Sequence, residues 1–311
     1  MGVFIIFGGA GFIGSYLVEK LLSEGNRVVV ADNLSTGTQR NVDLFTGHPG
    51  FSFHVHDATV PFTYAGDVDA VVNLASPASP PDYLRRPIET LTVNSVGTLH
   101  TLELARKKGA RYLLASTSEV YGDPLVHPQP ETYWGNVNPV GPRSVYDESK
   151  RFAETAATAF REQYGTETRV ARIFNTYGPR MRLDDGRVVT NMIGQALAGE
   201  PLTVYGDGTQ TRSFCYATDT VDGLLRLLGS DHPHPVNIGN PAEITVRELA
   251  DIIQQITGTH LPVEHRPLPQ DDPKQRKPDI TVARTELGWT PTVELRDGLA
   301  RTFAHLRDEN P

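Results

Sequence analysis

The chain of 311 residues contains a single cysteine, Cys215. One cysteine rules out an intrachain disulfide and a cysteine-based metal site, and it fits a reducing, cytoplasmic compartment. Positive charge is also scarce, because 29 basic residues stand against 37 acidic ones and leave a net charge of −8. General binding to nucleic acid or to an anionic membrane needs a basic excess, so we expect neither partner.

Long apolar runs are missing as well. Runs such as 3–7 and 28–31 are far shorter than the roughly 18 residues of a membrane span. Met1 is followed at once by a segment typical of a buried strand, so we expect no signal peptide. A hydrophobic content of 39% with 21% charged residues is that of an ordinary globular protein of one or two domains.

The first part of the chain alternates between apolar strand-like segments and stretches with helical spacing. This alternation predicts βαβ units on a parallel sheet, which is an α/β, Rossmann-like, doubly wound fold. The expected strands are 3–7, 27–31, 68–74, 111–115 and 168–173, and the expected helices are 15–23, 88–108 and 146–164.

After Asn175 the pattern changes to turn clusters rich in Gly, Pro and Asp, with shorter helical stretches at 189–198, 218–228 and 245–257. We therefore expect a first domain over residues 1–174, which also receives part of about 214–240. A smaller lobe over 175–311 is expected to bind what the cofactor of the first domain acts on. The Pro-rich segment 260–278 has little periodicity and is predicted to be a loop or lid.

A glycine-rich loop follows the first predicted strand. Gly8, Gly11 and Gly14 lie between strand and helix, where glycines allow a tight turn and let the backbone approach a pyrophosphate. Asp32 ends the next strand, 18 residues after Gly14, where a carboxylate can accept hydrogen bonds from a ribose and would repel a 2′-phosphate. The combination predicts NAD rather than NADP and makes residues 1–174 the NAD-binding domain.

A tyrosine and a lysine, Tyr146 and Lys150, share one face at the start of a predicted helix. A tyrosine of ordinary pKa is about 0.1% ionised at pH 7, a shortfall of roughly 4 kcal/mol that a nearby ammonium can reduce. Thr117 follows the fourth strand, at the edge where an open α/β sheet binds its ligands. We expect Tyr146 to act as a base with these two partners. A second Tyr-x-x-x-Lys, formed by Tyr16 and Lys20, is predicted to be a surface pair.

Seven further segments are informative, namely 73–81, 116–123, 141–150, 169–180, 186–191, 201–212 and 270–279. They span nearly the whole chain and resemble the extended short-chain dehydrogenase/reductase family, which contains nucleotide-sugar epimerases, dehydratases and decarboxylases. The first, fourth and last are most similar to the branch that decarboxylates a nucleotide-linked glucuronic acid. Phe7 departs from the family, which usually has threonine near the end of the first strand.

The resemblance implies binding roles for two sets of residues. Cofactor contacts are expected from Gly8, Gly11, Phe12, Ile13, Gly14, Asp32, Asn33, Ser35, Thr36, Gly37, Asp57, Ala58, Leu74, Ser76, Ala115, Tyr146, Lys150 and Thr176. Contacts to the nucleotide sugar, UDP- or dTDP-glucuronate, are expected from Ser79, Asn175, Asn191, Tyr205, Gln210, Arg212 and Arg276. Two arginines suit a diphosphate, because guanidinium groups form bidentate bonds with phosphate.

The reaction depends on the fate of the oxidised sugar. In the family the tyrosine, here Tyr146, takes the proton of the sugar O4 while C4 gives a hydride to NAD. Dehydratases carry an aspartic acid where this chain has Ser118, which is too weak an acid to expel a hydroxyl. Oxidation of a uronate at C4 makes a β-keto acid that loses CO₂ readily. The enolate then needs electrostatic support and a proton at C5, roles for which Glu119, directly or through water, and Arg276 are candidates.

Residue chemistry alone leaves a 4-epimerase open, because epimerisation requires only that the keto sugar rotate. The resemblance implies NAD-dependent decarboxylation of UDP-glucuronate to UDP-xylose. A non-catalytic NAD-sensing regulator is a remote alternative, since such proteins can lose the tyrosine or lysine that this chain keeps. No metal is expected, because His54 and His56 with Asp57 lack a further ligand in sequence reach, and a hydrolase would need a Gly-x-Ser-x-Gly motif that is absent.

A homodimer is also implied by the resemblance. It would form through the helices at about 94–108 and 146–164, which carry more apolar positions than one face needs. These positions are Leu99, Leu102, Leu104, Phe152, Ala153, Ala156, Ala157 and Phe160. The same pattern is compatible with packing in the core.

Overall fold

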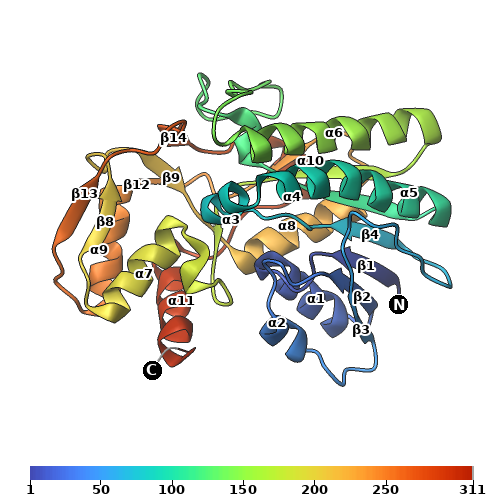
Figure 1. Cartoon of the computed structure of the whole chain (residues 1–311), viewed down its shortest axis with the longest axis horizontal. Helices are drawn as coiled ribbons and strands as arrows, with labels where there is room; N and C mark the ends of the chain where they lie inside the picture. Colours follow the sequence, from blue (N-terminus) through green and yellow to red (C-terminus); the bar gives the residue numbers. More distant parts are fainter. Residues whose placement is uncertain (310–311) are drawn as a thin grey trace.

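A seven-stranded parallel sheet forms the centre of the first lobe in the computed structural model, which describes residues 1–309 (Figure 1). The strand order is β11-β6-β5-β4-β1-β2-β3, and every neighbouring pair is parallel. The strands are β1 (Val3–Phe7), β2 (Arg27–Asp32), β3 (Phe51–Val55), β4 (Ala70–Asn73), β5 (Arg111–Thr117), β6 (Thr168–Ile173) and β11 (Val236–Ile238). The predicted α/β fold class with a doubly wound parallel sheet is confirmed.

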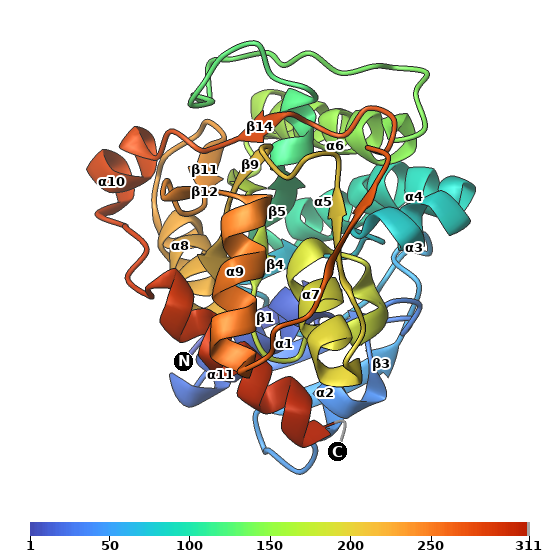
Figure 2. The ribbon, with the colours of Figure 1, turned by 90° about the vertical axis from the view of Figure 1, so that its left-hand side faces the viewer.

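Helices cover both faces of this sheet (Figures 1 and 2). On one face α5 (Thr98–Lys108) and α6 (Ser144–Tyr164) pack in a core that includes Ile5. On the other, α1 (Phe12–Ser23) and α8 (Ala217–Gly229) pack in a core that includes Ile6. Successive strand residues point to opposite faces, so a continuous apolar strand such as β1 supplies both cores.

The long helix expected over 88–108 is divided into three pieces. These are α4 (Pro87–Thr92), a π-helical turn over Val93–Gly97, and α5. Asn94 in the π turn donates to the hydroxyl of Ser149 on α6 at 3.0 Å, which ties the turn to the neighbouring helix. Such turns often mark functional sites within helices.

The second lobe packs three helices around its own core (Figure 2). These are α7 (Val188–Ala198), α9 (Val246–Thr257) and α11 (Leu295–Glu309), which bury side chains such as Met192, Leu249 and Leu299. Its short strands are β8 (Leu202–Tyr205), β9 (Thr211–Ser213), β12 (Glu243–Thr245), β13 (Val263–Arg266) and β14 (Gln275–Arg276). A capping box starts α9, in which the Thr245 hydroxyl accepts from the backbone N–H of Glu248 and the Glu248 carboxylate accepts from that of Thr245.

Two segments differ from the sequence expectations. The stretch 260–278, predicted to be a loop or lid, contains β13 paired with β8 and β14 paired with β9. Both strands are short and polar, so no apolar period revealed them. In addition, α10 (Thr281–Leu287) and Trp289 pack against the first lobe, although they fall within the range 175–311 expected for the second. The last two residues of that range lie outside the described part of the chain.

Tyr16, predicted to lie on the surface, is buried. Its hydroxyl donates to the carbonyl of Pro179 at 2.8 Å, and the guanidinium of Arg180 lies 4.4 Å from the centroid of its ring. Lys20 is half exposed and pairs with Glu24 instead. The prediction was therefore wrong for Tyr16, because the segment after β7 (Thr176–Tyr177) covers this side of α1. No helix within residues 1–309 is long and apolar enough to cross a bilayer.

Candidate active site

A cavity of about 1110 Å³ lies at the carboxyl ends of the parallel strands and is lined by residues of both lobes. Every residue that the sequence analysis assigned to the cofactor, to the nucleotide sugar or to catalysis lines this cavity. Ligands of open α/β sheets bind at this edge. The volume exceeds the roughly 300–1,000 Å³ that is usual for a single small ligand, so it suits a dinucleotide together with a second substrate.

The backbone shapes one end of the cavity. A Cβ on Gly14 would lie 2.3 Å from the carbonyl oxygen of Gly8, and one on Gly8 would lie 2.7 Å from the backbone of Leu74 and Ala75. Gly8 also has a φ of +80°, which favours glycine. The first turn of α1 follows with no side-chain cap, because its N-cap residue is Gly11. The free N–H groups of that turn fit a pyrophosphate.

Asp32 lies beside this loop at the end of β2. Its carboxylate accepts hydrogen bonds from the backbone N–H of Ala10 at 3.0 Å and of Leu34 at 2.8 Å. Burial raises the pKa of Asp32, while these two bonds act in the opposite direction. Each carboxylate oxygen keeps a further lone pair, so the group still fits a ribose diol. Nearby, Asn33 donates to Asp57 at 3.2 Å, which fixes the two loops that flank this end.

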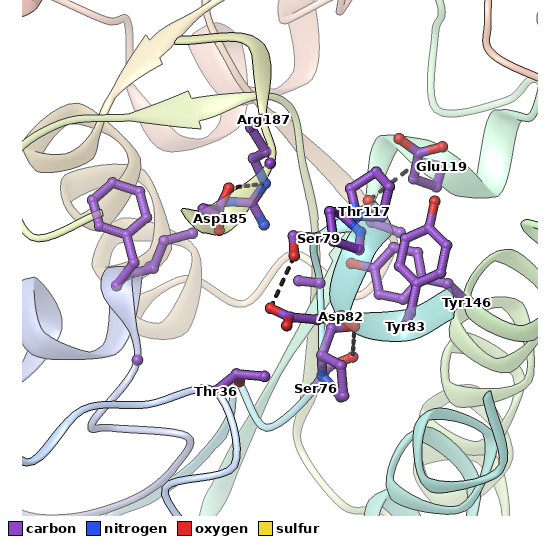
Figure 3. Close-up of a pocket in the computed structure, with 18 of the residues that line it drawn as sticks. Thr36, Ser76, Ser79, Asp82, Tyr83, Thr117, Glu119, Tyr146, Asp185 and Arg187 are labelled. Atoms are coloured by element: carbon purple, nitrogen blue, oxygen red, sulfur yellow. Dashed lines mark hydrogen bonds and ion pairs between the residues drawn. The ribbon is translucent and has the colours of Figure 1, made fainter. Parts of the chain in front are cut away.

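Tyr146, Lys150 and Thr117 line the cavity where β5 ends and α6 begins. Figure 3 shows Tyr146 beside Thr117. Burial raises the pKa of Tyr146 to about 12, although hydrogen bonding to Thr117 and the charge of Arg187 lower it. The Lys150 ammonium donates to the carbonyl of Ala115 at 2.9 Å. Burial lowers the pKa of Lys150 to about 7. The arrangement can hold a proton acceptor next to a cation.

Tyr83 was not expected in the site. It comes from α3 (Pro80–Arg85) and stacks on Tyr146, with the ring centroids 5.2 Å apart and the planes 6° from parallel (Figure 3). Its hydroxyl is buried and has no hydrogen-bond partner within residues 1–309. The stacking holds the Tyr146 ring in one orientation. A single tyrosine after a proline pair has no spacing that predicts this contact.

Glu119 lies between two arginines. The Nη2 atom of Arg143 donates to its Oε2 atom at 2.6 Å, and Arg276 donates to its Oε1 atom. Arg276 is itself buried and also donates to the carbonyl of Gly122 at 3.2 Å. Burial by itself would raise the pKa of Glu119, but the two guanidinium groups outweigh it and hold the pKa well below its usual range. Glu119 is therefore an anion at neutral pH.

The charge cluster extends to Asp272, whose carboxylate bridges two arginines. It accepts from Arg143 at 3.4 Å and from Arg212 at 2.8 Å. Three arginines and two carboxylates leave one net positive charge, which favours an anionic ligand. Arg143 and Asp272 lie within the segments 141–150 and 270–279 that carried the resemblance, but no role was assigned to either.

Side-chain bonds join three segments at the mouth of the cavity. Ser79 donates to Asp82 at 2.9 Å (Figure 3), and Arg182 donates to the same carboxylate at 2.8 Å. Arg182 also donates to the carbonyl of Thr36 at 3.2 Å, which connects the second lobe with the loop after β2.

Asn191 donates to the carbonyl of Gly186 at 3.1 Å, so its amide oxygen stays available to a ligand.

A family model described as GDP-mannose 4,6 dehydratase matches residues 5–302 of the chain. The chain belongs to the extended short-chain dehydrogenase/reductase family. Within this family, it is 56% identical over 296 residues to UDP-glucuronic acid decarboxylase 5 of Arabidopsis thaliana, covering 95% of this chain and 86% of the relative. It is 53% identical over 305 residues to UDP-glucuronic acid decarboxylase 1 of Xenopus tropicalis, covering 98% and 72%.

A solved structure of the same extended family is also similar over its whole length. It is a mutant UDP-glucuronic acid 4-epimerase from Bacillus cereus, in complex with UDP-4-deoxy-4-fluoro-glucuronic acid and NAD. The TM-score is 0.89 at 27% sequence identity, and the match covers 99% of both chains. Proteins with this fold are thus named for different reactions. The reaction therefore depends on the residues at the substrate end of the cavity and not on the fold.

Proposed function

We propose that the protein is an NAD-dependent decarboxylase that converts UDP-glucuronate to UDP-xylose and CO₂. The observation that carries the proposal is the Glu119 anion, clamped by Arg143 and Arg276 at the same cavity as Tyr146 and Thr117. Relatives named UDP-glucuronic acid decarboxylase, at 51–56% identity, support the same reaction.

The proposed reaction begins at the sugar O4. NAD, when bound, would supply the hydride acceptor for C4 and, after CO₂ has left, the hydride donor. Gly8, Gly14 and the first turn of α1 would hold its pyrophosphate, and Asp32 would hold a ribose. Tyr146 takes the proton of O4, since Lys150 in its ammonium form stabilises the tyrosinate. Thr117 holds O4 in place by a hydrogen bond.

Decarboxylation follows from the chemistry of the oxidised sugar. A 4-keto uronate is a β-keto acid, so the bond from C5 to the carboxylate breaks and its electron pair forms an enolate with O4. The hydroxyl groups of Tyr146 and Thr117 stabilise this oxygen. Glu119 is ionised and cannot donate a proton itself, so it orients a water molecule that protonates C5, and a proton from solvent neutralises the hydroxide that is left. Arg276 balances the charge of Glu119.

The first experiment is to incubate the protein with UDP-glucuronate and catalytic NAD⁺ and to identify the sugar nucleotide by mass. Loss of one CO₂ is expected. An unchanged mass with inverted C4 would establish an epimerase, which the likeness to the Bacillus cereus enzyme favours as the second candidate. No change would contradict both for the uridine nucleotide, and dTDP-glucuronate would be assayed next.

The role of Glu119 is tested separately by Glu119→Gln in D₂O. The variant is expected to turn over about a hundredfold more slowly and to incorporate deuterium at C5 with less stereochemical control. Glu162→Gln, an exposed charge change on α6, is the matched control and is expected to behave as the wild type. A Glu119→Gln variant with wild-type turnover would remove this residue from the mechanism.

The protein is further proposed to act as a homodimer through α5 and α6. Leu99 and Phe152 support this, because they remain 39% and 43% exposed on these helices. Five further residues that were candidates for the dimer contact are buried in the core of the first lobe instead. These are Leu102, Leu104, Ala153, Ala156 and Ala157. Light scattering after gel filtration is expected to give twice the chain mass, and the double variant L99E/F152E is expected to give the mass of one chain.

A further inference from the structure

A buried ion pair lies behind the catalytic residues and joins α6 to the sheet. Arg172 on β6 holds Glu154 with two bonds, from Nε to Oε1 at 2.9 Å and from Nη2 to Oε2 at 2.7 Å. Both side chains are only 13% exposed. The hydroxyl of Ser116 on β5 donates to the same Oε1 atom at 2.6 Å. The reaction described above makes no use of these three residues.

Glu154 follows Lys150 by one helical turn, so the two side chains share one face of α6. Lys150 donates to the carbonyl of Ala115, and Glu154 accepts from the hydroxyl of Ser116. The two charged groups are thus attached to consecutive residues of β5, and the next residue of that strand is Thr117. These two contacts fix the position of α6 along the direction of β5.

Few charged groups face the buried Lys150. Tyr146 is one titratable neighbour, with the Lys150 nitrogen 5.8 Å from the centroid of its ring. Glu154 is the charge that favours the ammonium form. Strand β5 contributes a carbonyl and a hydroxyl without charge, and β6 contributes Arg172, which is bound to the Glu154 carboxylate. The Glu154 carboxylate accepts hydrogen bonds from both neighbouring strands, from Arg172 on β6 and from Ser116 on β5.

We propose that Glu154, held by Arg172 and Ser116, is a positioning residue that keeps Lys150 in its ammonium form and in register with Tyr146 and Thr117. Its catalytic consequence rests on the proposed function. A neutral lysine cannot stabilise the tyrosinate, so removal of the nearby anion slows the first step. Burial already brings the pKa of Lys150 to about 7, where a modest change in charge decides its state.

The test observes Lys150 directly by NMR of protein labelled with ¹³C at the lysine Cε. The chain has six lysines, so the Lys150 signal is assigned by its loss in Lys150→Met. In Glu154→Gln we expect the titration midpoint of Lys150 to fall by about one pH unit. NAD⁺ reduction by UDP-glucuronate at pH 7 is then expected to slow about fivefold, because the ammonium fraction falls from about one half to about one tenth. Glu162→Gln on the exposed face of α6 is expected to change neither.

A second variant separates this role from simple stabilisation, because Glu154→Gln also leaves the buried guanidinium of Arg172 unpaired. The double variant Glu154→Gln/Arg172→Gln removes both charges. If Glu154 serves only to neutralise Arg172, the double variant regains the wild-type midpoint and rate, which overturns the proposal. If Glu154 supports Lys150, both values stay low while Glu154→Asp restores the midpoint. Failure of the wild type to act on UDP-glucuronate would contradict the proposed function alone, because the NMR midpoint needs no substrate.

Discussion

The two ends of the cavity are built in different ways. At the cofactor end the backbone shapes the site, since Gly8 and Gly14 leave no room for a Cβ. At the substrate end charged side chains shape it, and they come from distant parts of the chain. Arg276 and Glu119 are 157 residues apart, and Arg143 and Asp272 are 129 apart. The first end is formed within one lobe, where Gly8 and Gly14 lie against their own turn and against Leu74 and Ala75. The second end exists only when both lobes are folded.

This contrast predicts two kinds of sensitivity. A backbone site responds to added volume and is indifferent to salt. A charge cluster tolerates changes of volume but responds to ionic strength, because mobile ions screen its attraction for an anion. Tyr146 and Lys150 lie where the two ends meet, so changes there are expected to have the largest effects.

Tyr146→Phe is expected to lower turnover of UDP-glucuronate by about a thousandfold. Phenylalanine keeps the ring and its stacking on Tyr83 but cannot accept the O4 proton. The measurement is NADH absorbance in a single turnover with excess enzyme, with NAD binding as the control for an intact cofactor end. Turnover within tenfold of the wild type would contradict the role of Tyr146 as the base.

Lys150→Met is expected to stabilise the ligand-free protein while it abolishes most activity. Burial lowers the pKa of Lys150 to about 7, whereas an unfolded lysine titrates near 10.4. Between these values the unfolded chain binds more protons, so the stability of the wild type rises with pH across this window. The gain from methionine is therefore largest at pH 7 and below, roughly 5 kcal/mol at most, and shrinks towards pH 10. Urea unfolding at three pH values measures it, and a gain that does not depend on pH would be the contrary result.

Gly14→Ala is expected to weaken NAD binding about tenfold and to cost about 1–3 kcal/mol of stability. The added methyl would meet the carbonyl of Gly8 at 2.3 Å. Gly194→Ala in α7 is the matched control, because the nearest atom to its Cβ belongs to the flexible side chain of Leu183 at 3.5 Å. Calorimetry at two salt concentrations should give the same loss for Gly14→Ala. Unchanged NAD affinity would show that the backbone does not shape this end.

Asp272→Asn is expected to have the smallest effect, a decrease of about threefold in the KM for UDP-glucuronate at low salt. The change frees Arg212 and Arg143 from a competing carboxylate and raises the local positive charge by one. Asp271→Asn is the neighbouring control, since its carboxylate accepts from Asn138 and contacts no arginine through a hydrogen bond. The difference from the wild type should disappear at high ionic strength. A change that salt leaves intact would contradict the electrostatic account.

Elements that are apolar and local were predicted well. The bounds of β1 and β6 agree with the sequence expectations, and β2 extends the expected strand by one residue. The strand β1 and the middle of β2 are continuous apolar runs, whereas β6 also carries Arg169 and Arg172. Strand β3 was not predicted, since it lies at the edge of the sheet with alternate residues exposed. Polar strands such as β14 gave no pattern at all. For Tyr16 the error is of another kind. The helix was predicted, but Tyr16 was expected on its exposed face and is buried.

The residues of the site also differ in how far they could be predicted from local sequence. Tyr146, Lys150, Thr117 and the glycine loop were found from spacing within single elements, and the resemblance added Glu119 and Arg276. Arg143, Tyr83 and Glu154 were not found, because an arginine before a helix, a lone tyrosine and an acid within a helix have no distinctive spacing. Their importance follows from what they contact, and those contacts cross between elements.

The sequence by itself therefore determined the alternation of strands and helices in the first lobe, the glycine turn with Asp32, and the tyrosine–lysine face of one helix. These depend on neighbouring residues, whose distances are set by the covalent chain and by regular backbone geometry. Only the tertiary structure decided that Glu119 is an anion between two arginines, that Lys150 is buried, and that Arg172 holds Glu154. Charge states depend on burial and on distances between groups far apart in the chain, and folding alone brings those groups together.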